Sequence, residues 1–345
     1  MKSATPRTAF RIQVGGATAS STASESTRQL LQLRVELDMD GPAAHCFIEL
    51  ADGLPPASGD PVEVKLDVGS GMVAVFTGTV AAVEAGTTGQ RIVAHGAFTR
   101  LGQTEVEGSY ESVSADFIIK DLIGKAGATA GTIAKGPELS AWALHRGPTA
   151  LGHLRGLATL CGAGLFADGG GKIHCATPKS GSADHQFTFG ETVTQLALQQ
   201  VPAAFDSVEV WGEGAASAKG ADKAHWLSTD LSGVSAKACI TPDGQVQTGK
   251  LGERPLRLRE GALRSGEAVE AVAKAWAAGL AARLLRGSVE VFAAPTVLPG
   301  DLVEIAGLPD GHPAAGLLGQ GRLLHVRAVR HVLDRQRGAL TRLGF

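Results

Sequence analysis

The chain has 345 residues, of which 44% are hydrophobic and only 19% are charged. This excludes a disordered protein and leaves room for two or three domains. Its 32 Lys and Arg residues nearly balance 34 Asp and Glu residues, giving a net charge of -2, so no overall field attracts nucleic acid or acidic membranes. Aromatic residues make up 5% of the chain, which leaves few rings for stacking the bases of single-stranded nucleic acid.

The first hundred residues alternate apolar and polar side chains in short runs. The clearest runs are 33–39, 62–67 and 91–98, joined by glycine-rich connections, and Asp40-Gly41-Pro42 is typical of a turn. Five or six short strands of this kind favour a small sandwich or barrel. We therefore predict a first tube-like β-barrel over residues 1–104.

The pattern changes near residue 110. Ser114 followed by apolar residues at helical spacing predicts a helix that ends at Gly127, with Asp116–Lys120 and Asp121–Lys125 as i,i+4 ion pairs. A second helix is predicted from Thr149, followed by a hairpin within 165–175. Residues 105–183 are thus predicted to form a helix–helix–hairpin α/β insert.

Strand patterns return at residue 187. A long amphipathic helix is predicted over 265–286, with Ser265 as its N-cap and Gly287 as its end, and strands follow it to the C-terminus. Residues 184–345 are therefore predicted to form a second tube-like β-barrel that includes this helix.

Two sequence matches indicate an internal duplication. Residues 59–64 (Gly-Asp-Pro-Val-Glu-Val) match residues 300–305 (Gly-Asp-Leu-Val-Glu-Ile), and Thr-Arg-Leu-Gly occurs at both 99–102 and 341–344. Similar spacing of the two matches favours two related units over chance. The predicted fold class is mixed and β-dominated (α+β): two similar β-barrels separated by a small α/β domain, with one long helix before the last strands.

Targeting and redox signals are weak. No apolar region follows the N-terminal residues, and the Ala/Leu-rich stretch 268–285 contains Glu270, Lys274 and Arg283, so neither a signal peptide nor membrane insertion is predicted. The four cysteines are far apart and lack C-x-x-C spacing. This favours reduced, buried thiols and synthesis in the cytosol.

No catalytic, cofactor-binding or metal site is predicted. Residues 169–172 (Gly-Gly-Gly-Lys) lack the spacing of a phosphate-binding loop. His174 and Cys175 are adjacent on a strand and therefore point to opposite faces, whereas His325 and His331 lack an identifiable third ligand. Acidic residues alternate with apolar ones or form helix pairs, which is typical of solvated faces and not of the paired carboxylates of a glycoside hydrolase.

Several segments follow a known order and spacing: 54–64 with Phe76-Thr77-Gly78-Thr79-Val80, Tyr110 with 114–127, 151–175, 205–211, the Ala-rich helix, 298–304 and 329–331. In these segments the chain resembles the phage late control gene D family, the baseplate hub proteins of contractile phage tails, and the hub half of the type VI secretion spike protein VgrG. The order and spacing of the segments carry the resemblance.

The resemblance implies a structural, non-enzymatic hub. In such a hub a homotrimeric ring with two barrels per chain adapts a sixfold tail tube to a threefold central spike. Because the chain ends at Phe345, the spike is expected to be a separate protein. Further expected partners are the tail tube or tube-initiator protein and the tape-measure protein. Assembly is expected in the bacterial cytoplasm as part of a phage tail or tail-like particle, without specific nucleic-acid recognition.

The repeated strands are the predicted subunit interface. Its candidate residues are Val62, Val64, Leu66, Val303 and Ile305. The polar alternating positions of the early strands, including Glu63, Lys65, Arg34 and Glu36, are expected to line a water-filled channel. Two alternatives remain: a tail-tip peptidoglycan hydrolase or carbohydrate-binding protein, and an unrelated two-barrel protein.

Overall fold

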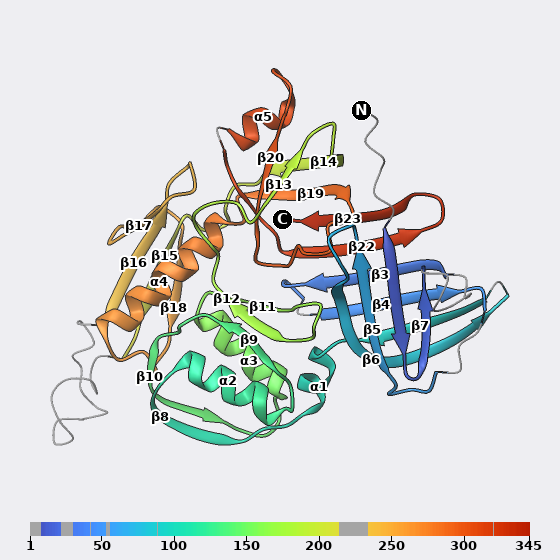
Figure 1. Ribbon diagram of the computed structural model, residues 1–345. Coiled ribbons are helices and arrows are strands. Elements are labelled where there is room, and N and C mark those ends of the chain that lie inside the picture. Colours follow the sequence, from blue (N-terminus) through green and yellow to red (C-terminus); the bar gives the residue numbers. More distant parts are fainter. Residues whose placement is uncertain are drawn as a thin grey trace.

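A sheet of eleven strands is the framework of the computed structural model (Figure 1), which describes residues 8–21, 30–41, 43–52, 56–87, 89–213, 234–319 and 321–345. Its strand order is β14-β19-β23-β22-β3-β4-β7-β6-β5-β1-β2. Strands from the beginning and the end of the chain therefore lie in one sheet. They meet where β3 pairs with β22.

The N-terminal strands have one buried face, as their alternating sequences predict. Burial alternates residue by residue in β3, β4 and β5, with Leu33, Val35 and Leu37 of β3 buried. The elements of this part are β1 (Ala9–Val14), β2 (Ala17–Ser20), β3 (Leu30–Asp38), β4 (Ala43–Leu50), β5 (Pro61–Asp67), β6 (Val73–Gly86), β7 (Gly89–His95) and α1 (Phe98–Gln103).

The middle of the chain forms two small sheets and two helices. The two helices and the hairpin were predicted, whereas strands β8, β9 and β10 were not. Its elements are β8 (Gly108–Ser114), α2 (Ala115–Lys125), β9 (Ala130–Ile133), β10 (Glu138–Leu144), α3 (Ala150–Leu160), β11 (Gly164–Ala167) and β12 (Ile173–Ala176). Both predicted ion pairs of α2 are present, with N–O distances of 2.9 Å for Asp116–Lys120 and 2.8 Å for Asp121–Lys125. The hairpin β11–β12 is also confirmed.

The C-terminal part contributes β14, β19, β22 and β23 to the large sheet and forms a separate sheet of order β13-β20-β21. Its strands are β13 (His185–Thr188), β14 (Val193–Gln200), β19 (Leu285–Phe292), β20 (Leu302–Ala306), β21 (Leu324–His325), β22 (Ala328–Asp334) and β23 (Gly338–Gly344), with α5 (Pro313–Leu318) between β20 and β21. The segment between β14 and β19 forms a separate sheet of order β17-β16-β15-β18, and α4 packs beside this sheet (Figure 1). Its elements are β15 (Ser207–Trp211), β16 (Ser235–Ile240), β17 (Val246–Thr248), β18 (Pro255–Arg259) and α4 (Gly266–Ala281).

Two predictions about the C-terminal part were wrong. Residues 207–211, which the sequence suggested for the second barrel, lie in the separate four-stranded sheet. The long helix begins as predicted, with the Ser265 hydroxyl accepting a hydrogen bond from the Ala268 N–H, but it ends at Ala281. Residues 285–286 already belong to β19, because they pair with Gln200 and Gln199 of β14.

The Thr-Arg-Leu-Gly match is not structural. Its first copy lies in helix α1 and its second in strand β23. A four-residue identity without a shared conformation is a coincidence of composition, so only the Gly-Asp match of the two supports a duplication.

The predicted fold class, mixed and β-dominated, is confirmed. Pairing among the described residues joins β1–β7 with β14, β19, β22 and β23 in one sheet, whereas β13, β20 and β21 form a separate sheet. The domain limits at residues 104 and 183 stay a prediction. Among the described residues no helix is both long and apolar enough to span a membrane, and the four cysteines are free, with Cys239 alone only partly buried.

Candidate assembly interface

The repeated Gly-Asp dipeptides form the same turn in both places. Gly59 and Gly300 both have a φ of 91°, a left-handed conformation that favours glycine. The Asp60 carboxylate accepts a hydrogen bond from the Ala57 N–H at 2.8 Å, and that of Asp301 accepts one from the Leu298 N–H at 2.9 Å. The duplication is therefore real at the level of individual hydrogen bonds.

The same turns pin two later strands at equivalent points. Val80 exchanges backbone hydrogen bonds with Gly59 and Asp60, and Val326 does the same with Gly300 and Asp301. From these anchors β6 corresponds to β21 and β22 together. β7 then corresponds to β23, β4 to β19 and β3 to β14. We call β3–β7 the first copy, and β14 with β19–β23 the second copy.

A shared irregularity supports this correspondence. The first strand of each copy shifts register by one residue at its start, between Leu30 and Gln32 in β3 and between Val193 and Gln195 in β14. Gln-Leu follows the shift in both strands. A bulge at the same place in two strands indicates common design and not chance.

Residues directly opposite one another form matching rows across four strands. The row in the first copy is Leu33, Ile48, Ile92 and Val83, and the row in the second copy is Leu196, Val289, Leu343 and Val329. The middle residues of both rows are fully buried. The row ends differ: Leu33 and Val329 are buried, whereas Val83 is 39% exposed and Leu196 is half-buried.

The buried row ends lie where the two copies meet. β3 pairs with β22 in antiparallel register, with Leu37 opposite Val329 and Val35 opposite His331. All four side chains are at most 2% exposed. The second copy therefore covers one edge of the first copy with an apolar, closely packed seam, which we call the internal junction.

His331 is a neutral polar group inside this junction. It shares a hydrogen bond of 2.9 Å between its Nδ1 and the Thr341 hydroxyl, which also accepts one from the Ala294 N–H. Burial disfavours the charged imidazolium and lowers the pKa of His331 to about 4. Protonation of this histidine would place an uncompensated charge in the seam.

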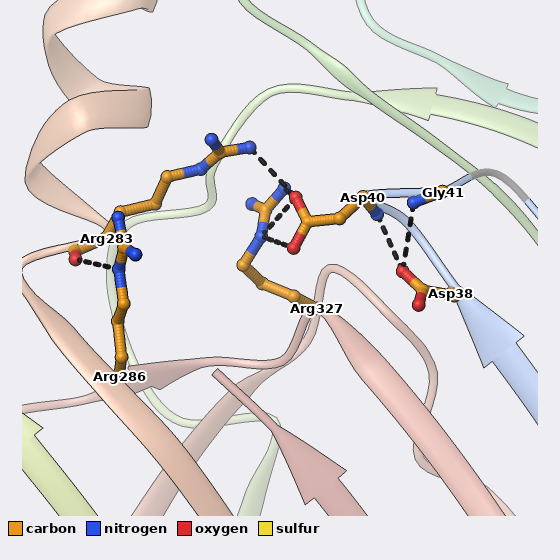
Figure 2. A network of polar contacts seen from close by, with 6 residues as sticks. All are labelled: Asp38, Asp40, Gly41, Arg283, Arg286 and Arg327. Carbon is orange, nitrogen blue, oxygen red and sulfur yellow. Dashed lines mark hydrogen bonds and ion pairs between the residues drawn. The ribbon is translucent and has the colours of Figure 1, made fainter.

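Charged groups cover the junction on its solvent side. Arg330 of β22 contacts Glu36 of β3 at 2.8 Å. At the end of β3, the Asp40 carboxylate lies between two guanidinium groups, those of Arg327 and Arg283 (Figure 2). The Nε of Arg327 and the Nη2 of Arg283 each lie 2.9 Å from an Asp40 oxygen.

The net effect of this network is an ionised Asp40. Partial burial opposes ionisation, but the two arginines outweigh it and lower the pKa of Asp40 below its usual value. The network ties the hairpin β3–β4 to the end of α4 and to the residue before β22. In the first copy, the position of Arg327 is taken by Ala81, three residues before Glu84.

Two equivalent edges are left without a partner strand. Within the described residues, β14 ends the sheet opposite to β2, and β6 beyond Val80 pairs with β7 on one side alone. Besides β19, β14 is contacted by α5, and Val193 at its start forms an isolated bridge with Phe189. Residues 81–87 are all exposed, and β14 is exposed at alternating positions including Ala197 and Gln199. These open edges are the counterparts of β22 and β3, the two strands that pair in the internal junction.

The predicted interface residues lie inside the chain's own core. Val62, Val64 and Leu66 are at most 2% exposed, Val303 is fully buried and Ile305 is 8% exposed. The polar neighbours on β5 face outward, and Glu63 and Lys65 form an ion pair with an N–O distance of 2.9 Å. That these five residues form the subunit interface stays a prediction.

The remaining sequence candidates have structural partners. His174 lies 3.1 Å from the Asp168 carboxylate, stacks on Phe166 and accepts the Thr132 N–H, whereas Cys175 is buried on the opposite face. His331 and His325 belong to different surroundings, the first bonded to Thr341. In the part of the chain that the structure describes, no three His, Cys, Asp or Glu side chains are grouped to hold a metal ion.

The sequence did not indicate the open edges, the internal junction or the Asp40 network. The strands involved are far apart in sequence, and β14 has a weak apolar alternation. One signal was available: the Gln-Leu pair at 32–33 and at 195–196, which marks equivalent strand starts.

Comparison with known proteins points to one kind of fold. No family model matches the chain, and no curated protein matches it significantly. A solved tail protein from Neisseria meningitidis is 15% identical with a TM-score of 0.68, covering 98% of this chain and 96% of that one. A 43 kDa tail protein of prophage MuSo2 from Shewanella oneidensis is 15% identical with a TM-score of 0.64, covering 97% of each chain.

A third similar structure comes from a secretion machine. It is an E. coli component of the type VI secretion system, described as structurally similar to T4 bacteriophage tail proteins. It is 11% identical with a TM-score of 0.53, covering 96% of this chain and 75% of that one. The chain therefore has the fold of these tail and secretion-system proteins over nearly its whole length.

Proposed function

We propose that the protein is a structural component of a phage tail or related injection particle, at the baseplate hub. The observation that carries this proposal is the duplication: one chain contains two copies of a five-strand unit in matching order, with matching turns and bulges. The shared fold with tail proteins over 98% of the chain supports the same assignment.

The duplication also supports the finer form of the proposal, a homotrimeric ring. Three chains with two equivalent copies each present six similar units, so one ring can face a sixfold structure on one side and a threefold structure on the other. The proposed neighbours are a tail tube or tube-initiator protein and a separate central spike. A tape-measure protein is a further candidate for the channel.

The solvated face of the large sheet suits the wall of a channel. Charged side chains of both signs alternate on it: Arg34, Glu36, Glu63, Lys65, Glu84, Arg91, Glu290, Arg330 and Arg342. Several are paired with each other, including Arg91 with Glu84 and Arg34 with Glu36, at 3.5 Å in both cases. Balanced charges give a hydrated surface without a strong net field, which lets a polymer slide past without adhering.

The proposal assigns no catalysis to the chain. It is tested by electron microscopy of the purified protein, alone and after co-expression with candidate spike and tube proteins from the same genome. Rings with a threefold axis and six similar lobes are expected. A monomer that remains single in both preparations and degrades peptidoglycan would replace the hub with a tail-tip hydrolase.

A further inference from the structure

We propose that the two open strand edges pair with each other between chains: the end of β6 in one chain adds to β14 of a second copy, in antiparallel register. This inference deepens the proposed hub function and depends on it, since it names the strands that join one protomer to the next. It also makes the contact between protomers an equivalent of the internal junction.

The internal junction shows how the two copies pair within one chain. There, the second copy's β22 pairs with the first copy's β3. The counterpart of β22 is the end of β6, and the counterpart of β3 is β14. Within the described residues neither pairs with a further strand, and the bridge of Val193 to Phe189 lies at the start of β14, away from residues 198–200. A duplicated unit whose two complementary edges join once within the chain offers the same pair of edges again at its two ends.

The internal junction also gives the register. Val329 opposite Leu37 becomes Val83 opposite Gln200, because Val83 corresponds to Val329 and Gln200 to Leu37. The neighbouring pairs follow in the same way. Arg330–Glu36 becomes Glu84–Gln199, and His331–Val35 becomes Ala85–Leu198.

The side chains at the two edges suit this register. On one face, Val83 and Ala85 lie opposite Gln200 and Leu198, so the partly exposed apolar groups Val83 and Leu198 become covered. On the other face, the Glu84 carboxylate lies opposite the Gln199 amide, which donates hydrogen bonds where the internal junction has an ion pair.

The symmetry of the contact distinguishes it from an ordinary edge-to-edge dimer. Each chain contributes β6 on one side and β14 on the other, so the contact is head-to-tail and every chain uses both edges. Such contacts close into a ring when the rotation fits. Closure also removes open strand edges, which otherwise promote aggregation.

Disulfide cross-linking tests the register. Glu84→Cys and Gln199→Cys are introduced together and also separately, in a Cys239→Ser background, since the other three native cysteines are buried. Directly opposite residues in antiparallel strands have Cα atoms about 4.5–5.5 Å apart, within the range a disulfide accepts. The control pair is Glu84→Cys with Gln195→Cys, which the register places about 13 Å away along the strand.

The expected result is a covalent ladder that ends at three chains for the 84/199 pair, with at least tenfold less product for the control pair. A mixture of the two single variants gives only linked pairs, and each single variant alone gives none. Single variants that link to themselves, or a control pair that links equally well, would overturn the proposed pairing.

Solution mass, measured on the same samples, separates this inference from the hub function. A three-chain assembly without any 84/199 cross-link overturns the proposed strand pairing but is consistent with the proposed ring. A chain that stays monomeric at high concentration and forms no cross-link overturns both.

Discussion

The end of β6 and strand β22 are the same element in two settings. Both follow a turn pinned by a Gly-Asp pair and both pair with the last strand of their copy. Yet Val329 of β22 is 1% exposed beneath β3, whereas Val83 of β6 is 39% exposed. The comparison shows that exposure here is set by what lies beside a strand and not by its sequence, since both positions hold valine. One edge is completed by the fold, and the other is left for assembly.

The largest loss of stability is expected from a charge at Val329, and almost none from the same charge at its counterpart Val83. Val329→Asp buries a carboxylate in the internal junction and is expected to lower the free energy of unfolding by about 4 kcal/mol or more. The matched variant Val83→Asp leaves the charge in water and is expected to change the stability of the dissociated chain by less than about 0.5 kcal/mol. Urea unfolding of both variants at low protein concentration is the measurement. Equal losses would contradict the distinction between the two edges.

The next largest effect is a pH dependence of stability that arises from His331 in the internal junction. Because the pKa of His331 is lowered from 6.5 to about 4, the unfolded chain binds a proton in that interval that the folded chain does not. Stability therefore falls as the pH drops from 6.5 to 4, by about 3 kcal/mol for a shift of this size. Carboxylates such as Asp40, whose pKa is also lowered, lose their contribution only below the usual carboxyl pKa.

His331→Gln keeps a polar side chain beside Thr341 and removes the titration. Unfolding free energies between pH 4 and 6.5 are expected to be flatter in this variant than in the native chain. His45 and His325, whose pKa values are also lowered by burial, remain in both chains and so cancel in the comparison. Identical pH profiles would show that His331 is not the titrating group.

The two Gly-Asp turns are expected to differ in strength. The Asp301 carboxylate contacts Lys179 at 2.8 Å and His185 at 3.1 Å besides its turn hydrogen bond, and its side chain is 15% exposed. Asp60 is bonded in its turn to the Ala57 N–H. We expect Asp301→Ala to cost about 2 kcal/mol and Asp60→Ala about 1 kcal/mol in thermal or urea unfolding. The reverse order would mean that the charged partners of Asp301 contribute nothing.

The smallest change in stability is expected from removing the ion pairs at the solvent side of the internal junction. The Asp40 side chain is 54% exposed, so Asp40→Ala is expected to lower the free energy of unfolding by less than about 1 kcal/mol. The loss should shrink further in 1 M salt, where charges are screened. A loss that persists unchanged in high salt would show that Asp40 acts through packing.

Local features of the fold were predictable from the sequence. The α2 ion pairs, the Ser265 cap and the hairpin 165–175 depend on residues a few positions apart, and all are present. The Gly-Asp match also identified two equivalent turns, because this turn requires glycine and aspartate at the same positions.

Features that depend on distant contacts were not predictable. The pairing of β3 with β22 joins residues nearly three hundred positions apart, and neither strand's sequence identifies the strand with which it pairs. Alternation correctly placed Val62, Val64 and Leu66 on one face, but it could not tell whether that face meets the chain's own core or another protomer. The sheet β15–β18 was missed because an insertion between two paired strands leaves no mark in local periodicity.

The central claim is that two equivalent copies in each chain join head-to-tail into a ring of three. Native mass spectrometry of the purified protein, with Val83→Asp as the matched variant, tests it most directly. The native chain is expected at the mass of three chains of 35.3 kDa each, and Val83→Asp at the mass of one folded chain. A native protein that is monomeric at every concentration, or a Val83→Asp variant that assembles as well as the native chain, would contradict the account.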